Sequence, residues 1–533
     1  MELFDLSRHK TDKFLVGVYR SDKNQQQWVG STHLYNVRIK YDLFSSRNGE
    51  INSTEKPQYI LIFDYKNWDN FIYLYQCKGA SYKTEGEMLS MNYPKPQGTY
   101  YVYELGVEYQ LAPMDMEGFV RAFTKGKNAR ESFKPSTFTG EQLLSFTREN
   151  QLSHAVSLQE RPIRLGTLFS GIGAIEQAFD KMNLNHEIVF ACDNGDRELK
   201  ESQEELREIL KGKDNNDLEK ALSDLYKKEG GENMMERSYK ANYAIQEDRF
   251  YQDIRFLDGH LFRDKVDIIV GGSPCQAFSS NGKRGGFEDT RGTLFYEYAR
   301  IINEAQPKCF IFENVRGMVN HDKGRTWQII KQTFKELKYR IYIHHNERGQ
   351  EDPILDAVDY GIPQLRRRLF VVGIRNDIQL QQDFRFPEKV KLGDTTVNDY
   401  LDANVDTKYY LGQKGFEFVT THPSRAQVGL PVMTCQKANQ QFNWNGTFIF
   451  EPLSSKHTEE ILKKAYIGEW KGQRGVIRMF TPRECLRLMG FSDKFKIRVN
   501  DTMMWRQCGN SIAVNVLEKL MCQLIITGVF NTK

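Results

Sequence analysis

The chain has 533 residues, 40% of them hydrophobic, and its 74 lysines and arginines against 70 acids leave a formal net charge of +4. This length allows two or three domains with separate cores, and the nearly balanced charge does not by itself indicate a nucleic-acid partner. No run approaches the roughly 18 apolar residues of a membrane span, and residues 1–40 lack the apolar core of a signal peptide. The sequence therefore predicts a cytoplasmic protein with no membrane partner. Eight cysteines without a CxxC pair or Cys/His cluster argue against a metal site and against disulfides.

Residues 1–150 predict a small β-rich accessory domain. Short aromatic-rich runs separated by turn residues recur through this segment, which favours strands. Thr139 and Gln142 have capping-box spacing and indicate a short helix that ends near residue 148. Asp64, Gln76 and Lys78 have a spacing similar to the acid and QxK elements of Mrr-like nucleases, in which the acid binds a metal ion. Polar positions on an edge strand explain them as well, so DNA or protein binding is the preferred role.

A second region begins near residue 163 with the pattern of an α/β sheet. The apolar run 165–168 leads into a turn with Gly171 and Gly173, followed by an amphipathic helix over 174–182. The next apolar run, 188–191, ends at Asp193, about twenty residues past the turn. Nucleotide-binding folds place an acid there to accept hydrogen bonds from ribose hydroxyls. The pattern thus predicts a nucleotide-like ligand at the carboxyl ends of the first two strands.

Residues 196–237 are strongly charged and predict a helical hairpin inserted after the second strand. Apolar residues fall at helical spacing on two segments separated by residues 212–216: Leu206 and Leu210, then Leu218, Leu222 and Leu225. The charges are expected to form a solvated face, and the sequence does not indicate the role of the hairpin.

A reactive cysteine is predicted at the end of a further strand. The apolar run 266–270 precedes Pro274 and Cys275, and Pro274 fixes φ beside the thiol. A free cysteine can equally be a small apolar core residue. The apolar strand 310–315 then ends in Glu313 and Asn314, which places an acid at the same edge of the sheet.

Five short sequence blocks, taken in chain order, resemble those of the cytosine-C5 DNA methyltransferases of the bacterial and phage restriction-modification type. The blocks are LGTLFSGIG at 165–173, PCQ at 274–276, ENV at 313–315, QLRRR at 364–368 and GNS at 509–511. The resemblance covers residue 163 to the carboxyl terminus. It implies a Rossmann-like α/β sheet with helices on both faces over 162–384, and an irregular or β target-recognition domain over 385–476. Residues 477–533 then return to the catalytic domain, with a helix capped by Thr481 and a last helix over 512–526.

The resemblance also implies which residues bind and react. The cofactor is S-adenosylmethionine, which leaves as S-adenosylhomocysteine, and methyl transfer needs no metal. The implied catalytic residues are Cys275, Glu313, Arg366 and Arg368. The implied cofactor-binding residues are Phe169, Gly171, Gly173, Asp193, Asp253, Ile254, Pro274, Asn510 and Ser511, with Asn510 and Ser511 expected beside Phe169. The implied DNA-binding residues are Gln276, Ser279, Lys283, Arg284 and Thr434.

These residues suit one chemical sequence. The Cys275 thiolate attacks C6 of a cytosine rotated out of double-stranded DNA, and the arginines favour the thiolate. Glu313, with a pKa raised by burial, neutralises N3. The expected protein is a monomer that works with a separately encoded restriction endonuclease.

Three alternatives remain open: RNA methylation, a non-catalytic DNA-binding regulator, and a fused nuclease-methyltransferase. The transfer-RNA branch of the family has a Cys-Phe-Thr element where this chain has Met433-Thr434-Cys435, which disfavours the first.

Overall fold

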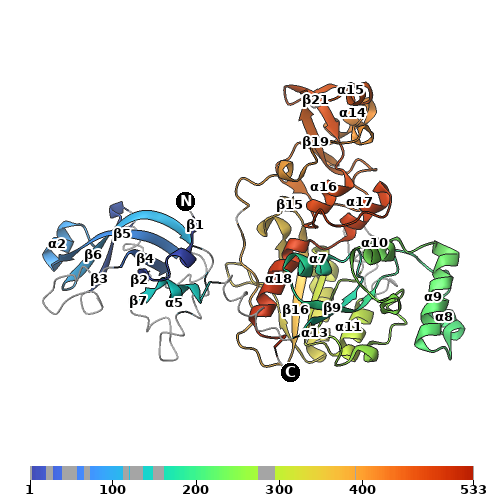
Figure 1. Cartoon of the computed structure of the whole chain (residues 1–533), viewed down its shortest axis with the longest axis horizontal. Helices are drawn as coiled ribbons and strands as arrows, with labels where there is room; N and C mark the ends of the chain where they lie inside the picture. Colours follow the sequence, from blue (N-terminus) through green and yellow to red (C-terminus); the bar gives the residue numbers. More distant parts are fainter. Residues whose placement is uncertain are drawn as a thin grey trace. The chain divides into compact units, whose positions relative to one another are not determined.

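The computed structural model describes residues 3–19, 28–29, 31–38, 57–64, 72–111, 114, 119, 136–147, 161–273, 294–390, 392–455 and 457–531. The chain divides into two compact units, Met1–Ser157 and Leu158–Lys533 (Figure 1). Among the helices of these described ranges, none is both long enough and apolar enough to cross a membrane.

The first unit is built on one twisted sheet with strand order β1-β6-β5-β4-β2-β7 and β3 paired to β6. Its central strand β4 buries both faces because side chains alternate along a strand. Ile60 and Ile62 join one apolar cluster, and Leu61 and Phe63 join the other. The strands are β1 (Leu3–Phe4), β2 (Lys13–Tyr19), β3 (Leu34–Arg38), β4 (Tyr59–Asp64), β5 (Ile72–Lys83), β6 (Tyr100–Leu111) and β7 (Ser136–Thr139).

Two short helices in the first unit start at capping boxes. Helix α2 (Glu85–Ser90) is capped by Thr84, and α5 (Gly140–Leu144) is capped by Thr139, whose side chain accepts from the Gln142 backbone N–H. The predicted helix start at Thr139 is therefore confirmed, although the helix ends at Leu144 and not near residue 148.

The second unit contains an open, mostly parallel sheet with strand order β10-β9-β8-β11-β12-β16-β13. Strands β8 to β12 run parallel, β16 is antiparallel to β12, and β14 and β13 pair with β16. The chain moves outward from β8 in one direction, then returns to β11 and moves in the other, so the strand order reverses between β8 and β11. Ligands of open α/β sheets bind beyond the carboxyl ends of the strands at such a reversal. The strands are β8 (Ile163–Leu168), β9 (His186–Cys192), β10 (Phe250–Tyr251), β11 (Ile268–Gly271), β12 (Cys309–Val315), β13 (Tyr339–Tyr342), β14 (Ile354–Asp356) and β16 (Arg367–Arg375).

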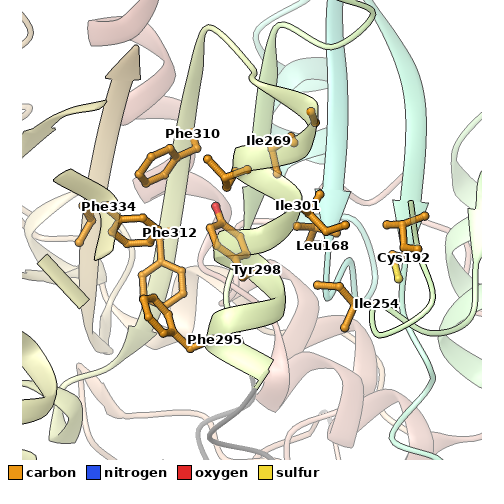
Figure 2. Close-up of a cluster of buried hydrophobic side chains, with 14 of the residues drawn as sticks. Leu168, Cys192, Ile254, Ile269, Phe295, Tyr298, Ile301, Phe310, Phe312 and Phe334 are labelled. Carbon is orange, nitrogen blue, oxygen red and sulfur yellow. The ribbon is translucent and has the colours of Figure 1, made fainter. Parts of the chain in front are cut away.

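Helices cover both faces of this sheet because right-handed crossovers in opposite directions lie on opposite faces. Helix α7 (Ala174–Lys181) connects β8 to β9 and packs against α18 (Val514–Ile526), whereas α11 (Leu294–Ala305) connects β11 to β12. On the α11 face, Phe295 and Tyr298 meet Phe310 and Phe312 of β12 and Phe334 of α13 (Arg325–Glu336) in a fully buried aromatic cluster (Figure 2). This rigid core fixes β12, which carries Glu313.

The inserted segment after β9 forms helices, as predicted. They are α8 (Gln203–Leu210), α9 (Asn215–Gly230) and α10 (Met234–Asn242), and α8 and α9 lie at one end of the unit (Figure 1). Leu206, Leu210 and Leu222 are buried, but the aromatic side chain of Tyr226, and not Leu225, completes the inner face of α9.

The segment after β16 has more regular structure than the sequence predicts. A four-stranded sheet with order β17-β19-β21-β20 packs against α14, with Phe416, Phe448 and Ile477 in its core. Helices of nine and six residues offer too few apolar repeats to be recognised in a sequence. The elements are α14 (Gln413–Thr421), β17 (Ala426–Val428), β18 (Met433–Thr434), β19 (Gly446–Pro452), α15 (Glu459–Lys464), β20 (Gly468–Trp470) and β21 (Gln473–Arg478).

Three elements join this smaller sheet to the edge of the large sheet at which the parallel strands end. The sequence predicts the cofactor at this edge, which is called the cofactor edge. Strand β15 (Gln364–Leu365) pairs with β18, α16 (Pro482–Arg487) begins at the predicted cap Thr481, and α17 (Asp501–Asn510) precedes α18. A buried ion cluster anchors α16, because the Arg478 guanidinium donates to both Glu451 and Glu484. The predicted helix start at Thr481 is confirmed.

Candidate active site

The first element of the site is the tight turn after β8. Phe169, Gly171 and Gly173 all have positive φ, at 53°, 56° and 77°. A Cβ on Gly173 would lie 2.1 Å from the ring of Tyr243, whose hydroxyl donates to the Gly173 carbonyl at 2.7 Å. Glycine is therefore required at 173 by both conformation and space. Phe169 is partly buried against the sheet core, and a non-glycine residue in this conformation indicates local strain that the surrounding structure maintains.

Asp193 closes this turn from the end of β9. Its carboxylate accepts from the Gly171 backbone N–H at 2.8 Å and from the Gly195 N–H at 2.7 Å. Burial raises the pKa of Asp193 to about 6, and the two N–H donors oppose that rise. The predicted cofactor residues Gly171 and Asp193 are thus brought into direct contact.

Asp253 follows β10 and is almost fully enclosed, with 5% of its side chain exposed. Its Oδ2 accepts from the Tyr226 hydroxyl at 2.8 Å and from Arg255 Nη2 at 2.6 Å. Ile254 is buried, and its carbonyl accepts from Arg300. Asp253 is therefore a charge-neutralised, fixed group at the β10 end of the edge, and Tyr226 comes from the inserted helix α9.

Asn510 and Ser511 lie at the junction of α17 and α18. The Asn510 amide donates to the Asp196 carboxylate at 3.2 Å, three residues beyond Asp193, and the Ser511 hydroxyl donates to the Ile512 carbonyl. This brings the carboxyl-terminal GNS block to the loop after β9. Their expected position beside Phe169 stays a prediction.

The predicted nucleophile lies outside the described residues. The same is true of the other predicted site residues in 274–293, namely Pro274, Gln276, Ser279, Lys283 and Arg284. The last described residue before Cys275 is Ser273, two positions earlier. The Ser273 carbonyl accepts from the Asn314 side-chain amide at 3.0 Å. A Cβ on Gly272 would lie 2.0 Å from the Glu313 carbonyl, so only glycine permits this close approach. The segment that leads to Cys275 therefore runs directly against the Glu313-Asn314 step of β12.

Glu313 is paired with Arg368 across adjacent antiparallel strands. Glu313 Oε1 lies 3.2 Å from Arg368 Nε, and the two side chains are 14% and 17% exposed. Burial raises the pKa of Glu313, while Arg368 and Arg366 oppose the rise. The result is a carboxyl group that is more readily protonated than an ordinary glutamate yet remains bound to a cation. Such a group is a better proton donor at a given pH than a solvent-exposed glutamate would be.

Arg366 has a different environment from Arg368. It is 2% exposed, and its guanidinium donates to the carbonyls of Gln436, Gly509 and Ser511 at 3.0, 3.0 and 2.5 Å. These bonds connect the segment that follows β18 to the end of α17. The sequence predicts that both arginines favour the thiolate and hold the base and its flanking phosphate. In the structure the Arg366 guanidinium donates to main-chain carbonyls, whereas Arg368 contacts Glu313.

Cys435 is a site residue that sequence reasoning missed. Its Sγ lies 3.5 Å from Arg366 Nη1 and 3.7 Å from Arg368 Nη2. Burial alone would raise the pKa of this thiol, but the two arginines outweigh it and lower the pKa. Its neighbour Thr434, predicted to contact DNA, shares a hydrogen bond with the Thr447 hydroxyl at 2.9 Å. Only the pairing of β15 with β18 brings these residues to Arg366, and no local pattern signals that pairing.

The nuclease-like residues of the first unit are not brought together. In the antiparallel β4–β5 ladder, Gln76 is the register partner of Tyr59, whereas Asp64 lies five residues further along β4. At the rise of a strand this separates the two backbone positions by about 17 Å. A shared metal ion needs ligands within a few ångströms of it, so this register disfavours the nuclease interpretation.

One group of potential metal ligands occurs among the described residues, Asp258, His260 and Glu304 on the surface of the second unit. Asp258 caps a short helix, and Glu304 pairs with Arg300 and accepts from the Gly259 N–H. These protein partners account for the cluster without a metal ion.

An open, mostly parallel α/β sheet with acids at its carboxyl edge is typical of proteins that bind a nucleotide-like ligand at that edge. A family model described as C-5 cytosine-specific DNA methylase matches residues 163–525, all within the second unit. Because this match covers well over half of the chain, the chain belongs to the C-5 cytosine-specific DNA methylase family and is a DNA cytosine-C5 methyltransferase.

Named relatives agree with this assignment. The type II methyltransferase M.SsoII of Shigella sonnei is 37% identical over 299 residues, which are 55% of this chain and 71% of that protein. M.HpaII of Haemophilus parainfluenzae is 35% identical over 53% of this chain and 78% of its own length, and M.HhaI of Haemophilus parahaemolyticus is 34% identical over 47% and 73%. A solved mutant DNMT2 of Spodoptera frugiperda aligns with a TM-score of 0.48 at 18% identity, over 68% of this chain and 99% of that one.

Proposed function

We propose that this enzyme transfers the methyl group of S-adenosylmethionine to C5 of a cytosine in a specific sequence of double-stranded DNA, with Cys275 bonded transiently to C6. The observation that carries this proposal is the buried Glu313–Arg368 pair. Glu313 lies against the main chain of Gly272, three residues before Cys275. The relatives M.SsoII and M.HpaII are named type II methyltransferases, which supports a role as the modification enzyme of a restriction-modification system. Its partner would then be a separately encoded endonuclease, and we propose that the enzyme acts as a monomer.

The proposed reaction assigns one task to each side chain. The Cys275 thiolate adds to C6, and the displaced electron pair makes C5 nucleophilic while Glu313 gives its proton to N3. Arg368 keeps Glu313 in place, and we propose that it also helps to hold the base. After C5 has accepted the methyl group, a solvent base takes the C5 proton, and the electrons of that bond form the C5–C6 double bond and expel the Cys275 thiolate. The N3 proton returns to the Glu313 carboxylate, which restores the neutral ring.

The proposed cofactor site lies where the strand order reverses. S-adenosylmethionine supplies the electrophilic methyl group. The turn with Gly171 and Gly173 would let the backbone approach the cofactor closely, and Asp193, which accepts from the Gly171 N–H, would also accept hydrogen bonds from ribose hydroxyls. Asp253 and the Ile254 backbone would receive the adenine end, and Phe169, Pro274, Asn510 and Ser511 would complete the pocket.

The target carbon lies inside a stacked duplex, so the cytosine must rotate out, at a cost of a few kcal/mol. We propose that Lys283 and Arg284 contact DNA phosphates, with Gln276, Ser279 and Thr434 as further DNA contacts. We further propose that 162–384 and 477–533 form the catalytic domain, that 385–476 reads the DNA sequence, and that 1–150 is an accessory domain.

The decisive experiment maps 5-methylcytosine after incubation of the enzyme with S-adenosylmethionine and mixed DNA. We expect methylation of cytosine at one sequence, no methylation of RNA transcripts of that sequence, and no product from Cys275→Ser. The matched control is Cys522→Ser on α18, which should remain active.

A second measurement tests the covalent step directly. DNA with 5-fluorocytosine at the target should stay bonded to the wild-type enzyme, because fluorine at C5 cannot leave as a proton does. A denaturation-resistant complex with Cys275→Ser, or none with the wild type, would contradict the assignment.

A further inference from the structure

The inserted helix α9 packs against the cofactor edge, although the proposed reaction gives it no role. We propose that α9 is a cofactor-positioning element, in which Tyr226 and Glu219 hold the Gln252-Asp253 turn in the conformation that receives the adenosine end of S-adenosylmethionine. This inference rests on the proposed function only in taking Asp253 as part of the cofactor site. It replaces the expectation that the charged insertion is merely a solvated surface.

The inner face of α9 differs from the rest of the helix. Glu219, Leu222 and Tyr226 follow one another at intervals of three and four residues, so they share one face. Leu222 and Tyr226 are fully buried, whereas Lys220, Asp224, Lys227 and Lys228 of the same helix are exposed. The solvated charges are therefore confined to the outer face, and the inner face presents a carboxyl group and a hydroxyl group to the sheet.

Tyr226 acts on Asp253 through its hydroxyl group. That hydroxyl donates to Asp253 Oδ2 at 2.8 Å, and the ring lies 4.7 Å from the guanidinium carbon of Arg197. Arg255 also donates to this carboxylate, with its backbone N–H and Nε to Oδ1 and with Nη2 to Oδ2. Asp253 therefore has one orientation, and the hydroxyl of Tyr226 is the contribution that the insertion makes to it.

Glu219 acts on the preceding residue. Its Oε2 accepts from the Gln252 backbone N–H at 3.2 Å, and no cation among the described residues forms an ion pair with it. Burial raises the pKa of Glu219 to about 7, and the nearby carboxylates of Asp253 and Glu236 add to the rise. A buried acid that lies beside two other carboxylates and has no cation lowers the stability of the folded protein. A contribution of Glu219 to ligand binding would explain why an acid occupies this position.

The two ends of the insertion are tied to the same two cofactor segments. Arg197 donates to the side chain of Gln252 and to the Gly231 carbonyl at 2.9 Å. Asn233 donates to the Asp193 carbonyl at 2.8 Å and to Gln252 at 3.1 Å. Because Arg197, Asn233 and Gln252 are buried, these bonds couple the position of the insertion to the segments of Asp193 and Asp253.

An element that orients the cofactor without touching the reacting atoms contributes equally to the bound ground state and to the transition state. Loss of such a contribution raises KM and Kd for the cofactor and leaves kcat unchanged. A raised Kd with an unchanged kcat therefore distinguishes the proposal from a general structural role. Loss of a general structural role would lower the amount of active enzyme without changing Kd.

The test compares Tyr226→Phe with the wild-type protein by titration calorimetry with S-adenosylhomocysteine. Phenylalanine keeps the ring beside Arg197 and removes the bond to Asp253, so we expect Kd to rise about tenfold, with kcat at saturating S-adenosylmethionine within twofold. The matched control is Tyr339→Phe, which removes an equally buried hydroxyl bond, to the Pro307 carbonyl at 2.7 Å, on β13. That variant should bind S-adenosylhomocysteine like the wild type.

Variants of Glu219 provide an independent measurement if Tyr226→Phe folds poorly. Glu219→Leu removes the acceptor for the Gln252 N–H and should also raise Kd, whereas Glu219→Gln retains an acceptor oxygen and should restore most of the affinity. Wild-type affinity in both Tyr226→Phe and Glu219→Leu overturns the proposal. If Asp253→Ala also binds normally, the proposed cofactor site itself is wrong; if only Asp253→Ala weakens binding, the site stands and the role of α9 does not.

Discussion

Glu313→Gln is the substitution that most directly tests the proposed chemistry. Glutamine has nearly the same shape as glutamate and retains an oxygen that can face Arg368 Nε, 3.2 Å from the present carboxylate. It cannot give a proton to N3 of the cytosine. The substitution therefore removes one chemical property and leaves the packing around β12 in place.

The expected effect on rate is large and the effect on stability is small. A positioned general acid contributes about 10²–10⁴-fold, which corresponds to a barrier increase of about 3–5 kcal/mol at about 1.4 kcal/mol per factor of ten. Loss of the negative charge leaves Arg368 without its counter-ion, but Arg368 is 17% exposed and also donates to the Arg367 carbonyl. Removal of a buried acid with a raised pKa offsets part of this loss, so the free energy of unfolding should change by about 1 kcal/mol.

The assay is single-turnover transfer of labelled methyl groups to the mapped DNA site, with calorimetry of S-adenosylhomocysteine binding and thermal unfolding on the same samples. We expect a rate at least a hundredfold below wild type with unchanged cofactor affinity. Glu336→Gln, a matched change of an exposed acid on α13, should have the wild-type rate. A Glu313→Gln rate within tenfold of wild type would refute the role of this carboxyl as the proton donor.

Three further predictions concern stability and pH. Gly173→Ala should destabilise the protein by about 3 kcal/mol in urea unfolding, because its Cβ meets the Tyr243 ring, whereas Gly212→Ala, with the same sign of φ and no neighbour within 4 Å, should cost only about 1 kcal/mol; equal losses would contradict this reasoning. Burial raises the pKa of Asp193 to about 6, and cofactor binding should favour its ionised form, so cofactor affinity should fall as the pH drops below 6. Binding should then release protons near pH 6 but not at pH 8. Calorimetry of S-adenosylhomocysteine binding in buffers of different ionisation enthalpy measures this proton release. Arg478→Met should destabilise the protein by about 3–5 kcal/mol in urea, because it leaves two buried carboxylates without their cation, and a loss below 1 kcal/mol would argue against the buried ion cluster.

Local signals in the sequence were sufficient for several elements of the structure. The caps Thr139 and Thr481 begin helices where their spacing predicts, and the glycines at 171 and 173 have the positive φ that a tight turn requires. Asp193 lies at the end of its strand and contacts that turn. These features depend on neighbours a few residues away, so their patterns are complete within a short window.

Contacts between distant segments account for the differences. The sequence treats Arg366 and Arg368 alike, yet only pairing of β15 with β18 and the approach of α17 decide that Arg366 binds main-chain carbonyls and lies beside Cys435. The register of β4 on β5 likewise separates Asp64 from Gln76, although their spacing in the chain suggested a shared site.

The sequence by itself determined the family, the order of the blocks and the side chains available for the reaction, because each block is short and chemically distinctive. Only the tertiary structure decided which of those side chains meet, because the antiparallel partner of β12 comes from a segment more than 50 residues away and its register fixes the cation that faces Glu313. The same holds for α9. Its charge pattern is that of a solvated helix, and packing against the end of β10 turns two of its polar residues toward the cofactor edge.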